Sequence, residues 1–121
     1  MLEKDENNKY RHYKGGIYYK LEETIITDNY EMNNIGVEVV GEATFEETCE
    51  PMLILSFHRG KSKVAVCFKD RESTASEFVE DVVLYQSEKD DKIWVRYTEV
   101  FNGYVFNDIN DKSIKRFTKI D

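Results

Sequence analysis

Short runs of apolar, β-branched and aromatic residues, separated by turn signals, constrain the fold of this chain most strongly. The two clearest runs are Met52-Leu53-Ile54-Leu55-Ser56-Phe57 and Val64-Ala65-Val66-Cys67-Phe68, on either side of the polar residues 58–63. Runs of this length and composition are typical of two well-buried strands that form a hairpin. Both are far shorter than the roughly 20 apolar residues of a membrane-spanning helix, so we expect no membrane segment.

The same pattern recurs before and after this hairpin. Residues 10–27 carry aromatic and β-branched side chains on both sides of a Gly-Gly pair, which predicts two strands joined by a turn. Residues 36–48 alternate apolar and acidic side chains with one interruption, which predicts a bulged strand. Residues 92–97 predict a further strand, and residues 113–120 predict a final short one.

Only residues 73–85 show a helical pattern. Thr74 and Glu77 have the spacing of a capping box, and apolar residues follow at helical intervals. The end of this segment is rich in valine and resembles a strand. We therefore expect one short helix near residues 75–81 and a strand over residues 82–87.

These elements predict an all-β fold, a small antiparallel barrel or roll with at most one short helix. A parallel α/β sheet would need several crossover helices, which the pattern does not provide. The 121 residues are enough for one domain with a hydrophobic core. We assign residues 10–121 to a single β-barrel domain and residues 1–9, which are mostly charged, to a disordered polar tail.

Charge and cysteine content narrow the range of functions. A formal net charge of -7 argues against unspecific nucleic-acid binding, because an acidic surface repels phosphate backbones. The first residues lack the apolar core of a signal peptide, and the two cysteines, Cys49 and Cys67, are not in a Cys-x-x-Cys motif. We therefore expect a cytoplasmic protein with reduced thiols.

The motifs of common enzymes and metal sites are missing or incomplete. Gly60-Lys61-Ser62 lacks the first glycine of a P-loop. Residues 108–111 begin like a calcium loop, but Lys112 occupies the third ligand position, and the glycine and terminal glutamate of such a loop are missing. Two histidines, His12 and His58, are too few for a His-based metal site. No nucleophile elbow or dinucleotide-binding fingerprint occurs. We therefore assign no catalytic residue, metal or cofactor and expect a protein that is not an enzyme.

Several blocks of the sequence form an ordered set that resembles a known family. They are Tyr10-Arg11-His12-Tyr13-Lys14-Gly15-Gly16-Ile17-Tyr18, Glu47-Thr48-Cys49-Glu50-Pro51, Val83-Leu84-Tyr85, Trp94-Val95-Arg96 with Glu99 and Phe101, and Arg116-Phe117. The set is similar to the bacterial domain of unknown function 1653 (DUF1653). The resemblance implies an SH3-like antiparallel barrel and no particular activity. The long separation between the first block and the Trp block implies inserted strands or loops, including a hairpin, around residues 28–42 and 58–80.

One candidate site is a cluster of aromatic and basic side chains, which the resemblance places on neighbouring strands. Its members are Arg11, His12, Tyr13, Trp94, Arg96 and Arg116. Aromatic faces beside guanidinium groups suit a nucleobase with its phosphate, a methylated cation or a peptide. The competing interpretation is structural: the aromatic residues form barrel core, the arginines cover it, and His12 makes a structural hydrogen bond.

A second candidate site is the predicted hairpin over residues 58–71, the only basic stretch of the chain. This stretch contains one acidic residue, Asp70, and five basic residues, Arg59, Lys61, Lys63, Lys69 and Arg71. Arg59, Lys61 and Lys63 are the candidate anion-binding residues, because segregated positive charge permits selective binding of phosphate. The competing interpretation is a charged edge that prevents aggregation between strand edges.

We therefore predict a binding module for a small anionic ligand such as a nucleotide, or for a short nucleic-acid segment. The alternative is an acidic protein–protein adaptor or inhibitor that presents Glu46, Glu47 and Glu50 to a basic partner, or pairs an exposed strand edge with it. A third hypothesis is a hydrolase of nucleotide-like substrates that depends on His12. Eight tyrosines and open strand edges are also compatible with a homodimer.

Overall fold

A computed structural model describes residues 4–27, 36–57, 63–70, 80–107 and 112–120. In chain order the elements are η1 (Glu6–Asn8), β1 (Lys9–His12), β2 (Ile17–Ile26), β3 (Val37–Phe45), β4 (Glu50–Phe57), β5 (Lys63–Phe68), β6 (Glu80–Ser87), β7 (Ile93–Tyr97), α1 (Thr98–Phe101), β8 (Tyr104–Asn107), β9 (Lys112–Lys115) and β10 (Phe117–Lys119). The all-β class with a short helix, predicted from the strand pattern, is confirmed.

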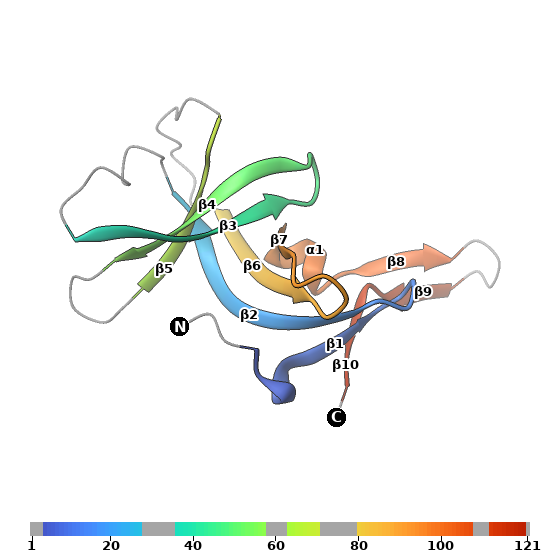
Figure 1. Ribbon diagram of the computed structural model, residues 1–121. Helices are drawn as coiled ribbons and strands as arrows, with labels where there is room; N and C mark the ends of the chain where they lie inside the picture. The colour runs from blue at the N-terminus through green and yellow to red at the C-terminus, as the bar shows by residue number, and fades with distance from the viewer. Residues whose placement is uncertain (1–3, 28–35, 58–62, 71–79, 108–111, 121) are drawn as a thin grey trace.

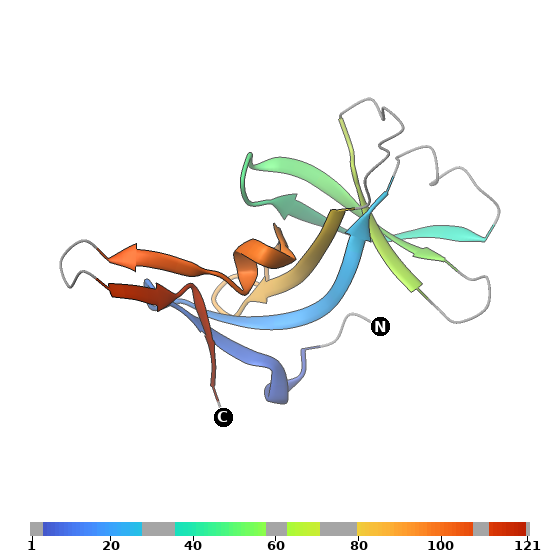
Figure 2. The same ribbon diagram turned by 180° about the vertical axis from the view of Figure 1, so that it is seen from behind.

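Six of these strands close into a barrel. Their order is β2-β5-β4-β3-β7-β6, and β6 pairs back onto β2 (Figures 1 and 2). The sequence predicted antiparallel pairing, which holds for β3–β4, β4–β5, β6–β7 and β2–β6. The pairs β2–β5 and β3–β7 are parallel. Both parallel pairs join strands that are not consecutive in the chain, a relationship that turn signals do not reveal.

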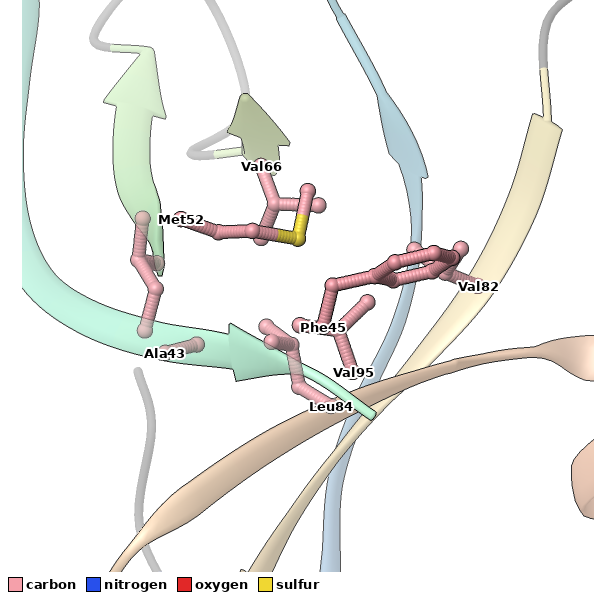
Figure 3. Packing of buried hydrophobic residues seen from close by; sticks show 8 residues of the cluster. Ala43, Phe45, Met52, Val66, Val82, Leu84 and Val95 are labelled. Carbon is pink, nitrogen blue, oxygen red and sulfur yellow. The ribbon is translucent and has the colours of Figure 1, made fainter. Parts of the chain in front are cut away.

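Strand β6 contributes to two hydrophobic cores because both of its faces are covered. Val82 and Leu84 point into the barrel, where they pack with residues such as Met52 and Val95 (Figure 3). Val83 and Tyr85, which alternate with them, belong to a second cluster outside the barrel. A run of four consecutive buried residues in β6 follows directly from this arrangement.

The second cluster lies under strands that extend the sheet beyond the barrel. β1 pairs with β2 on one side and with β10 on the other, so that β10 forms the edge. Phe101 of α1 stacks on Phe117 of β10 with ring centroids 4.3 Å apart. The β8–β9 hairpin projects from this end of the molecule (Figures 1 and 2). The candidate site described below lies against this second cluster.

Irregularities in β2 and β3 help these long strands to curve. The pairing of β3 with β4 shifts between Val39 and Gly41, which confirms the predicted bulged strand. The pairing of β2 with β6 shifts between Lys20 and Glu22. A bulge increases local bending and twist, which allows β2 to pair with β1 in one half and take part in the barrel along its length (Figure 1).

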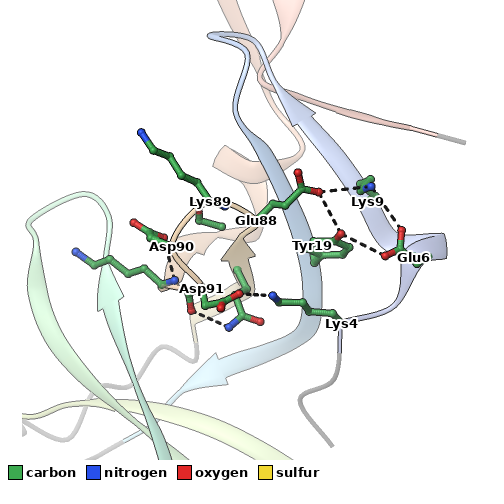
Figure 4. A network of polar contacts seen from close by, with 11 residues as sticks. Lys4, Glu6, Lys9, Tyr19, Glu88, Lys89, Asp90 and Asp91 are labelled. Carbon is green, nitrogen blue, oxygen red and sulfur yellow. Dashed lines mark hydrogen bonds and ion pairs between the residues drawn. The ribbon is translucent and has the colours of Figure 1, made fainter.

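The N-terminal segment is tied to the β6–β7 turn by charged side chains (Figure 4). Lys4 forms an ion pair with Asp91, and Lys9 lies 3.5 Å from both Glu6 and Glu88. The Tyr19 hydroxyl lies within hydrogen-bond distance of the carboxylates of Glu6 and Glu88. Residues 4–9, which the sequence analysis placed in a polar tail, thus include a single 3₁₀ turn and the first residue of β1.

The C-terminal region differs most from the sequence-based expectation. The single strand predicted over residues 113–120 is divided into β9 and β10, with Arg116 between them. Among the described residues the α-helix is α1, which no pattern indicated, and β8 was not predicted either. The helix predicted near residues 75–81 falls largely on residues outside the described ranges. No helix in the described part of the chain is long and apolar enough to cross a membrane.

Candidate functional site

A pocket of ≈ 330 Å³ opens beside the second cluster. Its walls come from the β1–β2 turn, β2, β6, β7, the residue after β3 and the junction between β9 and β10. The lining residues are His12, Tyr13, Lys14, Gly16, Tyr18, Glu46, Tyr85, Trp94, Arg96, Arg116 and Phe117. This volume is at the lower end of the range for small-molecule sites, about 300–1,000 Å³.

The β1–β2 turn brings three of these residues together. Gly15 has a φ of 104°, a conformation that glycine adopts at little cost, and its N–H donates to the His12 carbonyl at 2.7 Å. A side chain at Gly16 would meet the Tyr18 ring at 3.0 Å. The Tyr13 N–H donates to the Arg116 carbonyl at 2.9 Å. The turn is therefore fixed to the junction between β9 and β10, which also lines the pocket.

His12 is a neutral hydrogen-bond donor at neutral pH. Burial, followed by the positive charges of Arg96, Arg116 and Lys14, lowers its pKa from 6.5 to about 4. Its Nδ1 atom accepts a hydrogen bond from the Lys14 N–H at 3.2 Å. The proton of the neutral ring is therefore on Nε2, a buried atom with no hydrogen-bond partner in the described part of the chain.

Arg96 is held by two polar contacts. Its Nε donates to the Tyr85 hydroxyl at 2.7 Å, and its Nη2 lies 3.0 Å from Oε1 of Glu46. Its guanidinium carbon lies 5.5 Å from the centre of the Phe117 ring. Burial raises the pKa of Tyr85 well above its usual range, so the hydroxyl stays neutral as an acceptor. Arg96 therefore lines the pocket and also connects β7 to Tyr85 of β6 and to Glu46 at the end of β3.

Arg116 provides positive charge that no carboxylate in the described residues neutralises within ion-pair distance. Its backbone N–H donates to the Gly103 carbonyl at 3.0 Å, and its carbonyl accepts from Tyr13. Its Nε atom is buried and lacks a hydrogen-bond partner among the described residues. A buried donor left unpaired costs about 1–3 kcal/mol, so a ligand oxygen at this atom would recover that energy.

The aromatic lining residues divide into core and surface. Phe117 is buried, and the Tyr18 and Tyr85 rings pack edge to face at 5.4 Å. Tyr13 is 37% exposed and sits beside the His12 ring at 4.6 Å. Trp94 is half-buried, with the Lys92 ammonium 4.2 Å from its ring centre. The structural interpretation therefore applies to Phe117 and in part to Trp94, which packs against the second cluster. Tyr13 and Trp94 also line the pocket.

The structure brings together five of the six residues proposed for the aromatic and basic cluster. His12, Tyr13, Trp94, Arg96 and Arg116 all line the pocket. Arg11 does not, because it alternates with His12 along β1; it is exposed and pairs with Ile17 and Thr118.

The proposed anion-binding hairpin is mostly outside the described ranges. Arg59 and Lys61 are not among the described residues, and Lys63 is described only as the first residue of β5.

Sequence reasoning missed three polar residues of the pocket. Lys14 and Tyr85 were present in the blocks that carried the family resemblance, but neither was assigned a role. Glu46 was assigned to the acidic surface of the adaptor hypothesis. Its contact with Arg96 arises because Phe45 pairs in parallel with Val95, a register that a single sequence does not reveal.

The other chemical groups of the described residues offer no second centre. Cys49 is exposed, Cys67 is buried, and neither forms a disulfide. Within the described ranges, no group of three or more His, Cys, Asp or Glu residues is placed to hold a metal ion. Glu50 accepts a hydrogen bond from Thr48 at 2.7 Å, so this carboxylate, like Glu46, already has a partner within the chain.

Comparison with known proteins gives a partial match. No curated protein and no solved structure matches the chain. A family model described as "Protein of unknown function (DUF1653)" matches residues 70–119, which include Trp94, Arg96 and Arg116 but not His12 or Tyr13. The chain is therefore similar to the DUF1653 family over residues 70–119, the segment that forms β6 to β10 and one side of the pocket.

Proposed function

We propose that this protein is a binding module for a small organic anion that carries an aromatic ring, such as a nucleotide. The observation that carries the proposal is a pair of buried donors, Nε2 of His12 and Nε of Arg116, which have no partner in the described protein and belong to two residues that line one pocket. Phosphate oxygens accept hydrogen bonds from such groups, and bonds to charged donors are the stronger ones.

Charge in the pocket favours an anion. Lys14, Arg96 and Arg116 face a single carboxylate, Glu46, so the pocket is positive within a chain of net charge -7. Local positive charge selects compact anions, whereas the acidic remainder of the molecule repels long polyanions. A short nucleic-acid segment remains within the proposal, because it would place few phosphates outside the pocket.

The aromatic walls favour a planar group next to that anion. Tyr13 and Trp94 line the pocket and are not fully buried. Stacking of a base on an aromatic side chain contributes about 1–3 kcal/mol and tolerates different bases. The adaptor alternative has less support, because Glu46 is paired with Arg96 and Glu50 with Thr48.

The test is calorimetric titration with AMP, adenosine and inorganic phosphate, together with native mass spectrometry of freshly purified protein. We expect AMP to bind more tightly than either of its parts, and Arg116→Gln to weaken AMP binding at least about 10-fold, the effect of losing a charged hydrogen bond. Lys115→Gln, an equal change of charge at an exposed neighbouring residue, is the control. Equal binding of AMP by all three proteins, or no binding of any probe, would contradict the proposal.

A further inference from the structure

A second, smaller cavity of ≈ 190 Å³ shares a wall with the pocket. Glu46, Arg96 and Arg116 line both spaces. The remaining lining residues of the second cavity are Phe45, Tyr97, Val100 and the acidic Glu47, so this side is mainly aromatic and apolar with one carboxylate. The ion pair of Arg96 with Glu46 therefore lies between two spaces that both contain aromatic side chains. So does Arg116, which has no carboxylate within ion-pair distance among the described residues.

The second cavity has a fixed floor and an accessible rim. Phe45 is 3% exposed and packs edge to face against the Tyr97 ring at 5.3 Å. Tyr97 itself is half-buried, and Val100 on α1 is 37% exposed. An apolar or flat group that entered this cavity would cover Val100 and the open part of Tyr97, which removes apolar surface from water.

From this arrangement we infer that the ligand is bipartite, with two flat ring systems joined through phosphate, as in a dinucleotide. The inference rests on the proposed function and specifies its ligand. The phosphate linker lies at Arg96 and Arg116, one base lies between Tyr13 and Trp94, and the second nucleoside lies against Tyr97 and Val100.

The positions of the charges favour one bridging ligand. The basic groups shared by both spaces are at their common wall, where the linker of a bipartite molecule would lie. A mononucleotide in the larger pocket would leave the apolar side of the smaller cavity uncovered. Joining two groups that occupy adjacent subsites raises affinity, because the second contact forms within one complex.

The experiment compares AMP with the linear dinucleotide pApA and with an eight-residue single-stranded oligonucleotide, by calorimetric titration of the full chain. We expect pApA to bind about 5-fold to 150-fold more tightly than AMP, the range that one additional stacked base contributes. Val100→Trp fills the rim of the second cavity and should remove this difference while AMP binding stays unchanged. Val39→Trp, the same change at an exposed valine that lines neither cavity, is the control.

The outcomes separate this inference from the proposed function. If AMP binds with dependence on Arg116 but pApA binds within about 2-fold of it, the bipartite ligand is wrong and the proposed function stands. If Val39→Trp and Val100→Trp reduce the preference for pApA equally, the second cavity is not the subsite and the inference is also wrong. If the oligonucleotide binds at least as well as pApA, the two-base ligand is still supported, and the protein recognises it as part of a nucleic-acid strand. If no probe binds, both proposals fail.

Discussion

The Nη2 atom of Arg96 lies 3.0 Å from Oε1 of Glu46, so that an ion pair connects the end of β3 to β7 at the wall of the pocket. The arginine side chain is 10% exposed and the glutamate side chain 38% exposed. This contact has two opposing effects on the molecule. It stabilises the barrel where β3 and β7 pair in parallel, and it neutralises positive charge that an anionic ligand would otherwise meet.

Glu46→Gln should therefore lower stability and increase affinity for AMP. Loss of a hydrogen bond between charged groups costs about 1.5–3 kcal/mol, reduced here because Glu46 is partly exposed. Removal of the negative charge leaves Arg96 available to phosphate. Urea unfolding and calorimetric titration measure the two effects. Glu47→Gln, at an exposed neighbouring residue, is the control and should change stability little. A loss of AMP affinity in Glu46→Gln would show that the ion pair does not compete with the ligand for Arg96.

Tyr85→Phe should destabilise the protein by about 1–3 kcal/mol, because it leaves the Nε donor of Arg96 without its 2.7 Å acceptor in a largely buried position. Tyr104→Phe removes the same atom from a residue that is 64% exposed and should change stability by less than about 0.5 kcal/mol. Chemical denaturation of both variants tests the prediction. Equal stability of the two would mean that the hydrogen bond contributes nothing.

Trp94→Ala should weaken AMP binding about 5-fold or more, and Trp94→Phe should restore most of it, because stacking requires an aromatic face and not an indole specifically. Circular dichroism and urea unfolding establish whether each variant is folded. If Trp94→Ala is folded and binds AMP normally, Trp94 is not a stacking residue. If both variants unfold, Trp94 belongs to the core and the stacking role is wrong.

His12 should make the protein less stable in mild acid. Its pKa is about 4 in the folded protein, against 6.5 for the unperturbed side chain, so the unfolded chain binds the proton more readily. The stability contributed by the neutral ring is complete above pH 6.5 and is lost as the pH falls toward 4.

Urea midpoints at pH 7 and at about pH 4.5 measure this effect when His12→Gln is compared with the unchanged protein. Carboxylates titrate in both proteins, so the difference between the two pH profiles isolates His12. We expect a smaller loss of stability in the variant. Parallel profiles would show that folding does not lower the pKa of His12.

The local sequence predicted the strands well and their closure poorly. The alternation in residues 36–48 and the apolar runs around the polar residues 58–63 identified β3, β4 and β5, because burial of one or both faces leaves a periodic trace. The parallel contact of Phe45 with Val95 depends on packing between distant segments, for which a single sequence has no signal. Helix α1 has four residues, too few for a helical period to appear.

The candidate site shows the same division. The family resemblance grouped His12, Tyr13, Trp94, Arg96 and Arg116, which the structure places around one pocket. Strand alternation directs Arg11 away from them, which composition could not reveal. Glu46 reaches the pocket through the barrel closure, so its contact with Arg96 could not be predicted from the sequence.

Strand β6 has one face in the barrel core and the other beneath the pocket, and its backbone pairs with β2 over almost the whole length of both strands. The pocket wall and the barrel seam are thus the same piece of backbone. Local opening of the β2–β6 pairing, which closes the barrel, would therefore disrupt the pocket. A ligand bound in the pocket should in turn stabilise this pairing. Ligand binding in the pocket should then slow amide hydrogen exchange at Val82 and Leu84, although their side chains do not line the pocket.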